Sequence, residues 1–112
     1  MKPPFACLLV AAFAPLAQAG GIDPGVRPVP DLALERIRVP VPVVHHEQDN
    51  CRICPPGEVR RIVANLSATP RRELLWIKGG IAEGDPCEAL AHHGYNGVQG
   101  DVVAKIAAWI ER

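Results

Sequence analysis

The chain has 112 residues, with 12 basic and 12 acidic side chains, so its formal net charge near neutral pH is zero. This length supports one small domain, and the balanced charge, without a basic patch that carries aromatic residues, argues against nucleic acid as a partner. The longest apolar run is shorter than the roughly 20 residues of a transmembrane helix, so no stable membrane span is expected.

The first 19 residues have the layout of a secretory signal peptide. Met1-Lys2 is a short basic start, the apolar run FACLLVAAFA follows, and small residues stand at Ala17 and Ala19. We therefore expect cleavage after Ala19 and a secreted or periplasmic protein. Cys51, Cys54 and Cys87 remain after residue 19, in a compartment where disulfides persist. Their odd number leaves one bridge plus a free thiol, a metal site or an intermolecular bond.

Residues 20–54 change from an irregular arm to a strand and a polar loop. The arm at residues 20–30, GGIDPGVRPVP, is too rich in Gly and Pro for a regular element. Residues 31–39 favour either one helical turn capped by Asp31 or an extended approach to the strand. The run VPVV at residues 41–44 predicts a buried strand, and it ends in the loop HHEQDNCRIC, which carries Asp49.

A helix, a second strand and a last helix follow. Pro55-Pro56-Gly57 starts the helix, since proline suits the first helical position, and Pro70 predicts that the helix ends by Thr69. Its apolar residues recur at helical spacing: Val59, Ile62, Val63 and Leu66. Residues 71–78 predict a strand that Gly79-Gly80 ends. The next loop carries Asp85, Cys87, His92 and His93. Asp101 is the expected cap of a helix that ends at Glu111, with one apolar face formed by Val103, Ile106, Ala107 and Ile110.

This order predicts the α/β class, as a small parallel β-α-β-α unit over residues 31–112. Consecutive β-α-β segments give parallel strands, and functional groups lie beyond the carboxyl ends of such strands. Two strands and two helices do not obviously cover both faces of a parallel sheet. We therefore expect the unit to be part of a larger sheet, and to associate with itself or with a partner chain.

The ordered segments VPVVHHEQDNCRICPP, ELLWIKGG, GDPCEALAHHGYNG and VVAKIAAWI resemble the C-terminal end of a secreted α/β-hydrolase of the serine esterase or lipase kind. The resemblance implies that Asp49 is the acid, and His93 the histidine, of a catalytic Ser-His-Asp triad. In such a triad the imidazole takes the proton of the serine, and the carboxylate fixes the imidazole tautomer.

The nucleophile of that family lies in a G-x-S-x-G elbow upstream of the acid, and this chain contains no such motif. Its single serine, Ser67, follows the first helix. The expected protein is therefore a hydrolase-like fragment that is inactive alone. The alternative is a subunit that completes a hydrolase site with another chain.

The cysteines and histidines leave two other readings open. Cys51 and Cys87 fit a disulfide that ties the acid loop to the histidine loop and leaves Cys54 free. Cys51-Arg52-Ile53-Cys54 is also similar to a redox CxxC motif, although Pro55-Pro56-Gly57 separates it from the helix body. Three cysteines and four histidines could bind zinc, although the second half lacks a paired ligand motif. We expect no cofactor and no metal, and one ring of each His-His pair at the site.

Overall fold

The computed structural model describes residues 27–112. The predicted signal peptide, residues 1–19, and most of the predicted arm lie outside them. The described elements are three 3-10 helices, two strands and two α-helices. In chain order they are η1 (Val29–Asp31), η2 (Leu34–Arg36), β1 (Val41–His46), α1 (Pro56–Asn65), β2 (Arg72–Ile77), η3 (His92–Gly94) and α2 (Gln99–Ile110).

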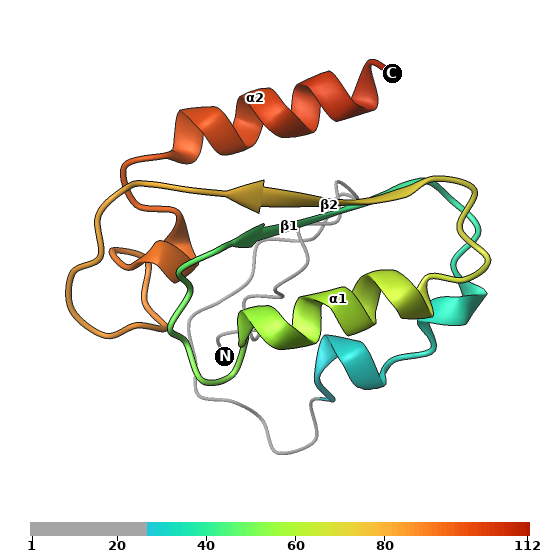
Figure 1. The fold of residues 1–112 in the computed structure, drawn as a ribbon, viewed down its shortest axis with the longest axis horizontal. Helices are drawn as coiled ribbons and strands as arrows, with labels where there is room; N and C mark the ends of the chain where they lie inside the picture. The colour runs from blue at the N-terminus through green and yellow to red at the C-terminus, as the bar shows by residue number, and fades with distance from the viewer. Residues whose placement is uncertain (1–26) are drawn as a thin grey trace.

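The two strands form a parallel pair in which Val41 lies beside Arg72 and His46 beside Ile77. The predicted α/β class and β-α-β-α order are confirmed. Figure 1 shows α1 and α2 on opposite sides of the sheet. The Val41 N–H donates to the carbonyl of Arg71 (2.9 Å), so odd-numbered residues of β1 bond to β2. The backbone nitrogen of Pro42 therefore points away from β2, and its missing N–H costs the sheet no hydrogen bond.

The α1 layer contains the larger of two apolar clusters. Side chains of a strand alternate between its faces, so Val41 and Val43 pack against α1, while Val44 and Ile77 pack toward α2. The predicted apolar face of α1 is confirmed, with Val59, Ile62 and Leu66 buried and Val63 partly buried.

The predicted face of α2 is right only at Ile106, which is half-buried against the cluster of Val44 and Ile77, while Val103, Ala107 and Ile110 are exposed. The helix buries Val102 and Trp109 and leaves Val103 and Ile110 at 66 % and 56 % exposure. Its N-cap is Val98, and Asp101 lies in the first turn. Because α2 has apolar residues on more than one side, periodicity could not select the buried one.

A contact at the far end of α2 fixes the helix rotation. The guanidinium of Arg71 lies 3.8 Å from the centre of the Trp109 ring and donates to the Trp109 carbonyl (2.9 Å). The cation–π contact with the indole is stabilising, and so is the position of this positive charge at the negative end of the α2 dipole.

The predicted boundary of the arm is also wrong. Val29 and Pro30 belong to η1, where Val29 packs against the α1 cluster. Asp31 ends η1 instead of capping the next turn, and its carboxylate pairs with Arg61 (2.7 Å). The fixed φ of proline suits a tight helical turn, and the partly buried Val29 side chain keeps this turn on the domain. In the described part of the chain, no helix has the length and apolar character to cross a bilayer.

Candidate functional site

Two loops meet at the carboxyl end of the sheet. One follows β1 and carries Asp49, and the other follows β2 and carries η3 with His93 (Figure 1). The Glu47 N–H donates to the carbonyl of Ile77 (2.9 Å), so the strand ends stay paired up to the point where the loops begin. Parallel pairing therefore delivers both loops to the same end of the molecule.

Asp49 and His93 form a buried hydrogen bond. Nδ1 of His93 lies 2.9 Å from Oδ2 of Asp49, and the two side chains are 6 % and 2 % exposed. A carboxylate only accepts, so Nδ1 of His93 carries the proton and the ring orientation is fixed. The predicted approach of these two residues at the carboxyl ends of adjacent strands is confirmed. Their catalytic role remains a prediction.

The other oxygen of Asp49 shapes its own loop. Oδ1 accepts the N–H of Cys51 at 2.8 Å, which is an Asx-turn. Both carboxylate oxygens are thus engaged, one by the local backbone and one by a histidine 44 residues away. The turn sets the direction in which the carboxylate points, so the loop sequence itself aims Oδ2 at His93.

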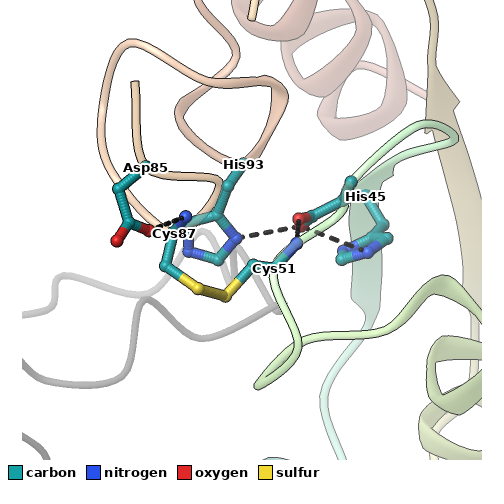
Figure 2. The surroundings of a disulfide bond; sticks show 6 residues. His45, Cys51, Asp85, Cys87 and His93 are labelled. Carbon is teal, nitrogen blue, oxygen red and sulfur yellow. Dashed lines mark hydrogen bonds and ion pairs between the residues drawn. A yellow bond between two sulfur atoms is a disulfide. The ribbon is translucent and has the colours of Figure 1, made fainter. Parts of the chain in front are cut away.

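A disulfide joins the two loops. Cys51 is bonded to Cys87, as predicted, and their Cα atoms are 4.7 Å apart. Figure 2 shows the bond beside His93. Such a bond is compatible with an extracellular location. Closing a loop of this size is worth roughly 4 kcal/mol in the chain-entropy model, and the closure also limits how far the two loops can separate.

The predicted free thiol at Cys54 is wrong. Cys54 is 6 % exposed and disulfide-bonded, and the described residues contain no free cysteine. The prediction rests on the odd number of cysteines after residue 19, whereas the full chain has 4. Since Cys51 is bonded to Cys87, the two cysteines of the CxxC motif are not bonded to each other.

His45 approaches the carboxylate from the strand. Its Nε2 atom is 3.5 Å from Oδ2 of Asp49, and the ring contacts Trp76 edge to face. Burial lowers the pKa of His45 below its ordinary value, against the opposing influence of the Asp49 charge. A buried ring with a lowered pKa favours the neutral form near neutral pH.

His46 and His92 have structural contacts. Nδ1 of His46 accepts the N–H of Gln48 (3.0 Å), and its Nε2–H donates to the carbonyl of Gly79 (2.8 Å). The ring of His92 stacks on that of His46 with centres 4.3 Å apart. As predicted, each His-His pair places one ring at Asp49 and the other elsewhere.

Tyr95, two residues after His93, anchors η3, and no pattern in the sequence marks it for this role. Its hydroxyl donates to the carbonyl of Val44 in β1 (3.1 Å), and its φ of 58° is left-handed. This conformation is strained for a bulky residue, and such strain persists only where surrounding contacts hold it. Burial, with a smaller influence from the Asp49 charge, raises the pKa of the Tyr95 phenol above its ordinary value, so it stays a donor.

Gly94, between His93 and Tyr95, permits a close approach. A Cβ atom there would overlap the backbone of Ala89. The short helix can therefore fold back on its own loop only with glycine at this position.

Ser67 lies at the opposite end of the sheet. It follows α1 and precedes β2, so it stands beside the amino ends of the strands, while Asp49 follows the carboxyl end of β1. A strand of six residues spans roughly 20 Å. The His93 imidazole therefore has no serine within reach among residues 27–112.

A metal ion is not an evident occupant of the site. Among the residues described, no group of three or more His, Cys, Asp or Glu side chains is arranged to hold one. The Asp49–His93 pair itself can perform proton transfer, because a carboxylate holds an imidazole whose ring can accept and release a proton.

Comparison of the chain with protein-family models, with curated proteins and with solved structures found no match.

Proposed function

We propose that this chain is an exported α/β-hydrolase-like module that carries the acid and the histidine of a Ser-His-Asp relay, Asp49 and His93, but no serine nucleophile. Alone it is inactive as an ester hydrolase. The supporting observation is the buried 2.9 Å hydrogen bond between these two residues, at the carboxyl end of parallel strands. In a serine hydrolase this bond fixes the tautomer in which the other ring nitrogen can take the proton of the serine.

The surroundings of the pair support an incomplete site. The cavity that both loops line, beside His92 and Asn50, has a volume of about 70 Å³. That is room for about two water molecules, whereas ligand pockets measure roughly 300 Å³ or more. This cavity is too small for a substrate, and the distance to Ser67 favours a module that lacks its nucleophile.

The second candidate function is a subunit that completes a hydrolase site with another chain. It is favoured by the number of contacts that hold the pair in place although no serine is at hand. A disulfide, the Asx-turn of Asp49 and the Tyr95 hydroxyl each restrict one of the two loops. In this reading the partner chain supplies the serine and the oxyanion donors, and the protein works outside the cytoplasm, secreted or in the periplasm.

An ester-hydrolysis assay tests the inactivity of the chain alone. Wild type, His93→Ala and the neighbouring control His92→Ala are compared on a small activated ester, and each is treated with a fluorophosphonate probe. We expect all three to match the rate of free imidazole at equal concentration, with no labelled serine. Turnover that disappears only in His93→Ala, together with labelling of Ser67, would falsify the proposal.

A further inference from the structure

The carboxylate of Asp49 has a second imidazole neighbour. Nε2 of His45 lies 3.5 Å from Oδ2, the same oxygen that accepts the hydrogen bond from His93. Figure 2 shows the rings of His45 and His93 on opposite sides of the site. The relay of a serine hydrolase needs only one imidazole on its acid, so the proposed function leaves His45 unused.

The position of His45 is unusual for a buried histidine. The residue is 1 % exposed, and its Nε2 atom has no hydrogen-bond partner in the described structure. A buried polar atom without a partner costs about 1–3 kcal/mol. The other ring at this end of β1, His46, has a partner at both nitrogens. Nε2 of His45 instead faces the carboxylate of Asp49, whose charge can stabilise a proton on this nitrogen.

We propose that His45 is a second proton-binding partner of Asp49, and that His45 and His93 compete for the negative charge of this single carboxylate. While His45 is neutral, the charge of Asp49 is available to stabilise a protonated His93. When Nε2 of His45 takes a proton from solvent, its positive charge lies 3.5 Å from Oδ2. Protonation of His93 then becomes less favourable, and the reverse also holds, because coupling between two sites is reciprocal.

Charged and titratable groups reach His45 from each element that packs around it. The titratable ones are Asp49 in the loop after β1, His46 on β1 and His93 on η3. The backbone of Cys54 also bonds to the ring. On the side of β2 the ring contacts the uncharged Trp76, and the guanidinium of Arg60 in α1 lies over that indole.

Burial is the strongest influence on the pKa of His45 and lowers it. Asp49 raises this pKa, His93 lowers it, and smaller influences come from Cys54 and His46. These signs are those of a carboxylate that attracts a proton to His45 and of a neighbouring imidazolium that repels it.

The consequence is an acid-sensitive site. Near neutral pH burial favours the uncharged form of His45, so the charge of Asp49 is available to His93. Acidification protonates His45 and withdraws part of the carboxylate charge from His93. That this lowers turnover in a site completed by a partner chain rests on the second candidate function, whereas the coupling of the two rings does not.

Histidine-ring NMR titrations of the full chain test the coupling. His45 is followed in wild type, His93→Gln, Asp49→Asn and the control His92→Gln. We expect the His45 midpoint to move up in His93→Gln, because a competing ring is gone. It should move down in Asp49→Asn, because the attracting charge is gone, and stay at the wild-type value in His92→Gln.

A measurement on wild type alone guards against variants that fail to fold. The ring N–H of His93 that bonds to Asp49 should shift along the same pH curve as His45. A His45 midpoint that is equal in wild type and a folded His93→Gln, or a His93 ring proton that does not respond to the His45 transition, overturns the proposal. These results do not depend on ester turnover, so failure of the coupling is distinguishable from failure of the proposed function.

Discussion

Two turns of this molecule share the sequence pattern Asp-x-Cys and the same local hydrogen bond. Oδ1 of Asp49 accepts the N–H of Cys51 at 2.8 Å, and Oδ1 of Asp85 accepts the N–H of Cys87 at 2.8 Å. The two cysteines are bonded to each other. Yet Asp49 is 4 % exposed and faces His93, whereas Asp85 is exposed to solvent.

The difference shows that local turn chemistry alone does not make a site. The Asp49 turn follows a fully buried strand, so its carboxylate is carried beneath η3, where low exposure strengthens the bond to the imidazole. The Asp85 turn lies in a long surface loop, where water competes for the same carboxylate. Variants of the two turns can separate the contribution of the shared hydrogen bond from that of burial.

Removal of the bond between the two turns should have the largest effect. The double variant Cys51→Ser, Cys87→Ser loses roughly 4 kcal/mol of stability in the chain-entropy model. Its Tm should fall by about 15 °C or more, since 1 kcal/mol corresponds to about 4–8 °C in a domain of this size. Thermal unfolding followed by circular dichroism measures it. An unchanged Tm would mean that the disulfide does not restrain the two loops.

The matched pair Asp49→Asn and Asp85→Asn compares the two turns directly. Asp49→Asn leaves a buried imidazole without its charged acceptor and should cost about 1–3 kcal/mol. Asp85→Asn changes an exposed side chain and should stay within about 0.5 kcal/mol of wild type. Urea unfolding of both variants gives the numbers, and equal losses would show that burial adds nothing to the Asp49 turn.

Acidification should lower the free energy of unfolding, because His45 is buried beside Asp49. In the unfolded chain this ring titrates near its ordinary pKa of 6.5, and burial lowers the pKa in the folded protein. Below about pH 6.5 the unfolded state therefore binds the proton first. The free energy of unfolding falls as pH drops through this window, by at most about 1.4 kcal/mol per pH unit for one proton.

Urea unfolding of wild type and His45→Phe between about pH 7.5 and 5 measures this slope. Phenylalanine fills the space of the ring but binds no proton, so the variant should show the shallower slope. His92→Gln serves as the control that keeps the wild-type slope. Parallel curves for wild type and His45→Phe would exclude His45 as the source.

Tyr95→Phe should give the smallest effect of the set. The phenyl ring keeps the packing but leaves the Val44 carbonyl without its donor, at a cost of about 1 kcal/mol. The free energy of opening of η3 should fall by a similar amount, because the hydroxyl links η3 to β1. The backbone amides of η3 should therefore exchange faster. Unchanged exchange there would show that Tyr95 does not hold the histidine loop.

The sequence was sufficient for the parts of the fold that depend on local pattern. The apolar run before His45 predicted β1, and helical spacing predicted the buried face of α1. The strand–loop layout placed Asp49 and His93 at one end of the sheet. A pairing of Cys51 with Cys87 followed from the same layout. Each of these predictions depends on elements whose order in the chain already limits their arrangement.

Other features depend on contacts that no local pattern encodes. Tyr95 bonds to a residue 51 positions away, and Arg71 fixes α2 by lying over the Trp109 ring. The rotation of α2 could not be predicted because its apolar residues do not mark one face. The contact of His45 with Asp49 could not be predicted either, because His45 lies within β1, where a buried histidine ordinarily has only a packing role.

The tautomer of His93 tests the central claim most directly. Long-range ¹H–¹⁵N NMR correlation spectra of the full chain near neutral pH show which ring nitrogen carries the proton. We expect protonation at Nδ1, with a ring proton shifted strongly downfield by its bond to Asp49 and lost in Asp49→Asn. A His93 protonated at Nε2 instead, with a spectrum that Asp49→Asn leaves unchanged, would contradict it.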